Sequence, residues 1–441
     1  MKRIFALLLL VCGSAFAQTN TNVVIDLPTT LRLAGAQNRD VLIARERLAE
    51  ARANADATTW QFFPWIGPGV AYRAHENAIQ DVGGKIVDVH REAYSVGPTV
   101  TAQVDLGDVI YKRLAAIQIA KAAEHGAEAQ AADASFAAAN AYFELSRAQA
   151  LIGVTEESVR LANDFARQVE SGVEAGVSFK GDALRARTQA ERNKLALRQA
   201  QGDRRVASAR LTQLLHLDSQ VELLPRLEDF APITLTETNL ALDALVGRAL
   251  AARPELRQSD ALLKAASEVK SGAKYGPLLP TVGAQVFAGG LGGGNQTSNR
   301  GLSESEDYQV TATWRIGPGG IFDRTRIRGA EARWNATHYE AEKVRDEIVR
   351  QVVEGFTRTQ AEADKLEIAK RAVAAAEQAY RLARGRQEAA VSSAFETIFA
   401  EQEYTRLRQD YVTSIAEYNK AQCLLVRAIG QMWPDVSPAP K

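Results

Sequence analysis

The sequence predicts a mainly α fold with four β-strands, in which a unit of long antiparallel coiled-coil helices and two strands occurs twice. Three features predict it: two long segments without proline, strand-length segments of alternating polarity, and an internal repeat. All 13 prolines lie outside Thr99–Leu224 and Gly319–Trp433. An interior proline costs a helix about 3 kcal/mol or more, so each of these segments is predicted to be a long helix that folds back once.

The first predicted helix runs from Thr30 to Thr58, where small and apolar residues recur on one face and Thr29 or Thr30 can cap the start. It leads into Trp60–Trp65, which has four aromatic residues beside a proline. Aromatic side chains concentrate at membrane–water interfaces, and they also fill hydrophobic cores. The sequence leaves both interpretations of this segment open.

Two strands are predicted next, at Ile66–Glu76 and Tyr94–Leu106, with an exposed polar loop at His75–Arg91 between them. In the second strand apolar residues alternate with polar residues or glycine, which places the two sets on opposite faces. Its length fits the roughly 9–11 tilted residues of a membrane strand. A strand of a soluble sandwich has the same alternation, and for this segment taken alone the soluble strand is favoured.

The first proline-free segment is predicted to form one helix from Gly107 to Gly172 and a return helix to about Leu217, with Ser178 as the cap of the return helix. At about 1.5 Å per residue, the first arm is on the order of 100 Å long, several times the width of a small domain. A polar link, Asp218–Asn239, follows.

The second half repeats this order at a shift of about 213 residues. A helix from Leu240–Leu256 onward ends at Pro277–Pro280, and strands are predicted at Thr281–Ala288 and Tyr308–Ile316 around a loop at Gly289–Ser305. The second long helix is predicted to break near residues 385–393 and to return to about residue 430. The predicted organisation is a signal peptide at 1–17, a first repeat at 18–217, a linker at 218–239, a second repeat at 240–430 and a tail at 431–441.

The signal peptide is predicted from the order of positive charge at Lys2–Arg3, an apolar block at Ile4–Val11 and small residues at Ala15–Ala17. Cys12 invites a lipoprotein interpretation, but the residue before it is not small. Cleavage after residue 17 is therefore favoured. It would leave Cys423 as the one cysteine, without an intramolecular disulfide.

Composition and motifs offer no enzyme, cofactor or metal site. The 53 basic and 53 acidic residues balance, which gives no reason to expect a nucleic-acid partner. No apolar run is long enough to predict a transmembrane helix. Of the five histidines, His75 and His90 share a loop with acidic residues, for which an exposed loop is favoured over a metal site. Gly289–Gly294 lacks the Lys-Ser/Thr of a phosphate-binding loop.

The turns of the two helical hairpins carry the informative residues. In the first turn these are Val177, Ser178 and Asp182. In the second they are Glu388, Val391, Ser392, Glu396 and Glu401. A charged helix end is usually only solvated, but carboxylates from several copies around an axis would form a ring that attracts cations.

Four strands cannot close a barrel, and an open sheet edge is not tolerated within a bilayer, so membrane strands would need other copies of the chain. The order of elements resembles the outer membrane efflux protein family, the TolC-like channel-tunnels. The resemblance covers about Leu27 to Gly430. It rests on the duplicated unit, on Pro277–Pro280 before a strand, and on the Val-Ser turns before an acidic helix start.

The resemblance implies a homotrimeric α/β-barrel channel-tunnel with four transmembrane strands per protomer, in the outer membrane and extending into the periplasm. It implies passive exit of substrate in a tripartite efflux pump or type I secretion system, with a periplasmic adaptor and an inner-membrane pump as partners. Glu396, with Glu388 and Glu401, would line the periplasmic aperture, although Phe399 occupies the family's second acidic position. The residues expected to contact the adaptor are Val177, Ser178, Asp182, Val391 and Ser392, and those expected at the membrane interface are Phe62, Phe63, Trp65, Tyr94, Tyr308 and Trp314.

A second interpretation is a soluble periplasmic coiled-coil scaffold or adaptor whose alternating strands form a small sandwich. Release from cells without detergent would distinguish it from an outer-membrane protein. The sequence does not identify the substrate, since drugs, metal ions and polypeptides all suit a duct that selects weakly.

Overall fold

The computed structural model describes residues 21–226, 230–236, 241–295, 298–389 and 391–431. The chain forms two compact units. The first unit comprises residues up to 41, 131–249 and from 351 onward, and the second comprises 42–130 and 250–350. The predicted signal peptide, 1–17, and the predicted tail after residue 431 lie outside the described residues.

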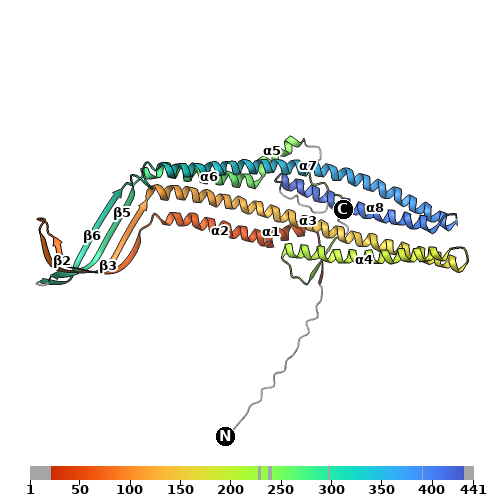
Figure 1. Cartoon of the computed structure of the whole chain (residues 1–441), viewed down its shortest axis with the longest axis horizontal. Coiled ribbons are helices and arrows are strands. Elements are labelled where there is room, and N and C mark those ends of the chain that lie inside the picture. The colour runs from red at the N-terminus through yellow and green to blue at the C-terminus, as the bar shows by residue number, and fades with distance from the viewer. Residues whose placement is uncertain (1–20, 227–229, 237–240, 296–297, 390, 432–441) are drawn as a thin grey trace, which may run out of the picture. The chain divides into compact units, whose positions relative to one another are not determined.

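Helices make up most of the described chain, and the strands belong to two sheets (Figure 1). The helices are α1 (Leu27–Gln37), α2 (Arg39–Trp60), α3 (Leu106–Glu174), α4 (Lys180–Leu215), α5 (Leu242–Ala252), α6 (Pro254–Tyr275), α7 (Arg324–Glu388) and α8 (Ala394–Ala428). The strands are β1 (Thr21–Ile25), β2 (Trp65–Gln80), β3 (Ile86–Asp105), β4 (Val221–Pro225), β5 (Thr281–Asn295) and β6 (Ser298–Thr313).

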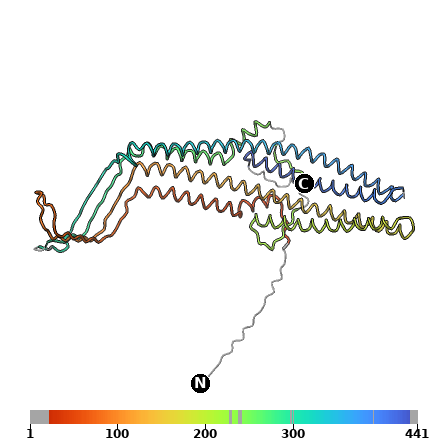
Figure 2. The backbone as a smooth tube through the Cα atoms, viewed as in Figure 1, coloured from red at the N-terminus to blue at the C-terminus, as the bar shows by residue number. Residues whose placement is uncertain are grey.

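The two long helical hairpins predicted from the absence of proline are confirmed. Helix α3 has 69 residues and α7 has 65, and their return helices α4 and α8 have 36 and 35 residues. Figure 2 shows each long helix turning back into its return helix. The close agreement in length between the two hairpins is the structural counterpart of the internal repeat.

The helix predicted from Thr30 to Thr58 is wrong in two respects. It starts at Leu27 with Asp26 as its cap, and α1 and α2 are separate helices that meet at Asn38. The Asn38 backbone is extended, with ψ of 128°. Its side-chain oxygen accepts a hydrogen bond from the Asp40 N–H at 2.9 Å, and its amide donates to the Leu214 carbonyl at 3.2 Å. Asparagine offers the backbone local partners outside a helix, which explains the break.

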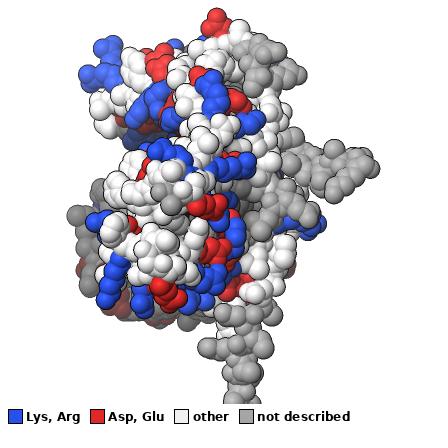
Figure 3. All heavy atoms as spheres, turned by 90° about the vertical axis from the view of Figure 1, so that its right-hand side faces the viewer, with Lys and Arg blue, Asp and Glu red and all other residues white. Residues whose placement is uncertain are grey.

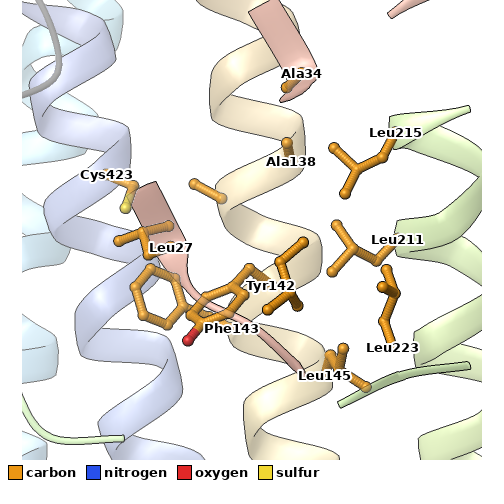
Figure 4. Close-up of a cluster of buried hydrophobic side chains, with 12 residues drawn as sticks. Leu27, Ala34, Ala138, Tyr142, Phe143, Leu145, Leu211, Leu215, Leu223 and Cys423 are labelled. Carbon is orange, nitrogen blue, oxygen red and sulfur yellow. The ribbon is translucent and has the colours of Figure 1, made fainter. Parts of the chain in front are cut away.

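A hydrophobic core joins the parallel pair of strands β1 and β4 to the helices of the first unit. Leu211 and Leu215 of α4 and Leu223 of β4 are completely buried (Figure 4). The Leu223 N–H donates to the Ser208 hydroxyl at 2.7 Å, which ties β4 to α4. Burying one such leucine contributes about 1.5–3 kcal/mol, so the predicted linker at 218–239 holds part of the core.

The second unit contains a four-stranded antiparallel sheet in the order β2-β3-β5-β6. The loop predicted at His75–Arg91 is wrong, because β2 continues to Gln80 and β3 starts at Ile86. The turn is confined to the residues between them. There the Asp81 N–H donates to the Lys85 carbonyl at 2.9 Å, and the Lys85 N–H donates to the Asp81 carboxylate at 2.8 Å.

The loop predicted at Gly289–Ser305 is also wrong, because β5 runs to Asn295 and β6 starts at Ser298. The glycines of β5 are strand residues that give room to a neighbouring strand. A Cβ atom at Gly292 would lie 2.3 Å from the ring of Tyr94, its partner on β3. A large side chain on one strand therefore covers the space that glycine leaves on the next.

Candidate functional site

The sheet of the second unit has one face of apolar side chains, none of which is buried in the protomer. Val100, Val286 and Tyr308 are partners across β3, β5 and β6. Val310 and Val70 on the same face are 80% and 78% exposed. The apolar face consists of Ile66, Val70, Tyr72, Val100, Ala102, Val104, Val282, Ala284, Val286, Tyr308, Val310 and Ala312. On β6 the apolar face ends at Tyr308, because the next residue towards the start of the strand on that face is Glu306.

The opposite, polar face carries amide and hydroxyl side chains. Thr101, Gln285 and Gln309 are partners across three strands and border a depression of about 180 Å³. The polar face consists of Thr99, Thr101, Gln103 and Asp105 on β3, Thr281, Gly283, Gln285 and Phe287 on β5, and Asp307, Gln309, Thr311 and Thr313 on β6. The alternation predicted from Tyr94 to Leu106 therefore extends across the sheet.

The predicted interface aromatics lie in two groups. Phe62 and Phe63 follow α2, and Trp314 follows β6, so all three are at the end of the sheet where strands meet helices. Tyr94 and Tyr308 lie farther along the strands, on the same side as the apolar face.

Trp65, the first residue of β2, lies at the same end of the sheet as Phe62 and Phe63 but differs in the face that its ring covers. A Cβ at Gly67 would meet its ring at 2.8 Å, and Gly67 pairs with Thr99 of the polar face. The ring of Trp65 therefore lies on the polar face. No helix among the described residues is both long enough and apolar enough to cross a membrane.

The first hairpin turn, residues 175–179, exposes two apolar side chains. Val177 is 77% exposed and Phe179 is 82% exposed. The N–H groups of Val177 and Ser178 both donate to the Gly172 carbonyl, at 2.8 and 3.0 Å. The prediction that Ser178 caps α4 is wrong, because Phe179 precedes the helix and no side chain caps it. Asp182, in the first turn of α4, forms an ion pair with Arg185 at 3.1 Å.

The second hairpin turn brings each of its exposed carboxylates to an arginine. Arg386 of α7 lies 3.0 Å from Glu396 of α8, across the turn. Arg384 lies 3.0 Å from Glu388, one helical turn along α7. Figure 3 views the hairpin ends and shows basic and acidic side chains interspersed there. Two of the predicted aperture carboxylates thus have counter-ions in the same protomer.

Val391 and Ser392 form the same turn and are not buried. Val391 is 66% exposed, and its N–H donates to the Arg386 carbonyl at 3.0 Å. One turn into α8, the rings of Phe395 and Phe399 stack at 6.4 Å while both remain largely exposed. The second hairpin turn therefore exposes apolar side chains beside paired charges.

Glu401, the third predicted aperture carboxylate, lies inside the helical bundle and is only 4% exposed. It accepts hydrogen bonds from Ser158 of α3 at 2.9 Å, Asn193 of α4 at 3.1 Å and Thr405 at 3.1 Å. Burial raises the pKa of the Glu401 carboxyl, and these hydrogen bonds oppose the rise. The structure does not bring Glu401 to the exposed turn with Glu388 and Glu396.

Sequence reasoning missed the residues that surround Glu401, since neither spacing nor charge marks them. The signal that could have indicated a buried partner is the set of polar residues on the buried sides of α3 and α4, which are Ser158, Gln189 and Asn193. The described residues contain no group of three side chains arranged to hold a metal ion. His90 instead lies 3.1 Å from Glu76 on the neighbouring strand, within the β2–β3 hairpin.

Comparison with known proteins places this arrangement in context. A family model described as "Outer membrane efflux protein" matches residues 30–216 and 245–431. No curated protein matches the chain.

Solved structures share its fold at low sequence identity. The outer-membrane channel OprN has 21% identity and a TM-score of 0.76, covering 92% of this chain and 90% of OprN. VceC from Vibrio cholerae has 18% identity and a TM-score of 0.75, covering 92% and 97%. CmeC from Campylobacter jejuni has 15% identity and a TM-score of 0.75, covering 93% and 87%.

Proposed function

The chain belongs to the outer membrane efflux protein family, and we propose that it is the outer-membrane exit duct of a tripartite efflux pump or type I secretion system. It passes substrate from an inner-membrane pump and a periplasmic adaptor across the periplasm and the outer membrane. Transport through it is passive, and the pump supplies the energy.

The exposed apolar face of the sheet is the observation that carries the proposal. Val310, Val70, Tyr308, Ile66 and Tyr72 are each more than 60% exposed in the protomer. Leaving apolar surface in water costs about 25 cal/mol per Å², and soluble monomers seldom display large contiguous apolar patches. Lipid contact removes this cost, while the polar face opposite would border water.

The free edges of the same sheet support a homotrimer. Strands β2 and β6 each have one neighbour in the protomer, which leaves one edge of each unpaired. Because neighbouring strands alternate in direction, β6 of one copy can pair antiparallel with β2 of the next. A bilayer does not tolerate unpaired edges, so closure by further copies satisfies the backbone groups of both strands.

The hairpins would line the periplasmic part of the duct, and their turns would meet the adaptor. Val177, Ser178, Asp182, Val391 and Ser392 are the proposed contacts. The exposed apolar side chains near them suit a protein partner, since apolar and aromatic residues form the centre of such interfaces.

The proposed aperture is lined by Glu396 and Glu388. Glu401 acts on it only through the packing of α8 against α3 and α4. The proposed membrane-interface aromatics are Phe62, Phe63, Tyr94, Tyr308 and Trp314. Trp65 is removed from the predicted set, because its ring lies on the polar face.

A pair of neighbouring substitutions tests the membrane placement. Val310→Arg puts a charge on the apolar face and should cost about 2–4 kcal/mol in the bilayer, so the variant should fail to assemble in the outer membrane. Gln309→Arg makes the same charge change on the polar face and should assemble. Membrane fractions extracted with and without detergent give the readout. A soluble scaffold would tolerate both substitutions and would leave the cells without detergent, which would refute the proposal.

A further inference from the structure

Asp307 is an exposed carboxylate in the middle of the polar face. It pairs with Phe287, which in turn pairs with Thr99, and it lies two residues from Gln309 on the same strand. Since side chains alternate between the faces of a strand, Asp307 shares its face with Gln309 and not with Tyr308. Within the described part of the chain, no lysine or arginine lies within ion-pair distance of it.

The surroundings of Asp307 leave its charge uncompensated. From the Asp105–Thr281–Thr313 row to the Gly97–Gly289–Ser305 row, the polar face carries no basic residue. Its other acidic residue, Asp105, accepts a hydrogen bond from the Asp108 N–H at 3.0 Å at the start of α3. Asp105 is therefore engaged with a helix N-terminus, which partly offsets its charge.

At the hairpin end, in contrast, the exposed carboxylates have counter-ions. Glu396 and Glu388 are paired with Arg386 and Arg384, so these four side chains sum to zero charge. The field of such a pair falls off faster than that of a single charge, and salt screens it within about 8 Å at physiological ionic strength. Glu401 is buried and contributes no exposed carboxylate.

We propose that Asp307 is the residue that sets the charge selectivity of the duct, and that it makes the outer segment favour cationic solutes over anionic ones. Copies around the axis would place a ring of Asp307 carboxylates on a wall of threonine and glutamine side chains. Charge focused in a narrow aqueous passage with low-dielectric walls raises the local concentration of counter-ions. The inference rests on the proposed function, because the polar face borders a passage only if the sheet is closed.

Reversal potentials of the purified trimer in planar bilayers under a KCl gradient test the selectivity. Asp307→Asn should lower the cation-to-anion permeability ratio at least about threefold. Glu306→Gln is the matched control, because it removes the same charge from the next residue on the opposite face and should leave the ratio unchanged. Removing both members of the neutral pair, in the double variant Glu396→Gln with Arg386→Gln, should change it little. A ratio that persists in Asp307→Asn and collapses in the double variant Glu396→Gln with Arg386→Gln would overturn the proposal.

Thiol labelling in membranes gives a second readout that does not need conductance. Gln309→Cys should react with membrane-impermeant thiol reagents, and Val310→Cys should not. At Gln309→Cys the cationic reagent should be favoured over the anionic one, relative to their rates with a free thiol in solution. Adding Asp307→Asn should remove that preference.

The outcomes separate the two proposals. Equal labelling of the two cysteine positions contradicts the proposed membrane sheet. Selective labelling of Gln309→Cys without an effect of Asp307→Asn contradicts only the role of Asp307.

Discussion

Replacing Glu401 with glutamine is expected to stabilise the helical bundle of the first unit at neutral pH and to weaken its dependence on pH. Burial raises the pKa of the folded-state carboxyl above the ordinary value of 4.5. The folded protein therefore binds this proton more tightly than the unfolded chain does. The resulting stabilisation is complete below the unfolded-state pKa and is lost as the pH rises through the folded-state pKa. Glutamine does not titrate, so its contribution to stability does not change with pH.

The hydrogen-bond geometry sets the size of the effect. A glutamine oxygen can still accept from Ser158, Asn193 and Thr405, at 2.9, 3.1 and 3.1 Å in the wild type. The new amide would face the Gln189 amide, whose nitrogen lies 3.5 Å from the second carboxylate oxygen, and this donor–donor contact offsets part of the gain. Because the pKa is raised and this contact opposes only part of the effect, Glu401→Gln should unfold at a higher temperature than the wild type at pH 8.

Glu401→Ala supplies the opposite perturbation. It removes the acceptor that Ser158 and Asn193 share and leaves a void between α3, α4 and α8. An unsatisfied buried donor costs about 1–3 kcal/mol, so this variant should be less stable than the wild type at every pH.

Thermal unfolding of the detergent-extracted protein, followed by circular dichroism at one scan rate between pH 4 and pH 8, compares the three proteins. The hydroxyl of Tyr380 also has a pKa raised by burial, so it stays neutral over this range and adds no slope. If the wild type gained stability relative to Glu401→Gln as the pH rose, Glu401 would be held as a carboxylate and the reasoning would be refuted.

Three further outcomes are expected. Cys423 should resist thiol reagents at pH 8 until the protein unfolds, because it is buried and burial raises its pKa to about 12; labelling of the native protein would contradict this. Leu211→Ala should cost about 2–5 kcal/mol in the core that Figure 4 shows, with Leu211→Met within about 1.5 kcal/mol as the control, measured by thermal unfolding. Gly292→Ala should impair assembly in the membrane by collision with Tyr94, and Tyr94→Ala in the same chain should restore it, as membrane fractionation would show.

The helices were largely predictable because proline is a local and decisive signal. The predicted start at Gly107 differs from the observed start at Leu106 by one residue, and the break before Lys180 was placed within a few residues. Proline excludes the interior of a helix whatever the helix packs against. The break between helices at Asn38 could not be predicted in this way, because it depends on a hydrogen bond to Leu214, far away in the sequence.

The strands were predicted where polarity alternates and missed where glycine replaces it. Glycine has no side chain to report a face, so the segment from Gly289 onward was predicted to be a loop. Its strand conformation becomes intelligible only with Tyr94 of the neighbouring strand above Gly292. The sequence of one strand does not contain this information, because the pairing partner is almost 200 residues away.

The candidate aperture shows the same division between local and non-local signals. The Arg384–Glu388 pair follows from a spacing of four residues along one helix, which sequence alone can recognise. The Arg386–Glu396 pair crosses the hairpin turn and depends on how α7 and α8 meet. Glu401 has the same residue type as Glu396 and lies on the same helix, yet it is buried because that side of α8 meets Ser158 and Asn193.

The distribution of apolar side chains supports the proposed assembly with further copies of the chain. In the helical bundle, alanines such as Ala138 and Ala190 are buried and allow the helices to approach closely, while the large buried residues gather around Leu211. In the sheet, large side chains such as Val310 and Tyr308 remain in contact with solvent. A soluble scaffold would have to leave this surface in water at about 25 cal/mol per Å². In the proposed assembly, insertion of a closed sheet into lipid would remove that cost. The same step would satisfy the free edges of β2 and β6.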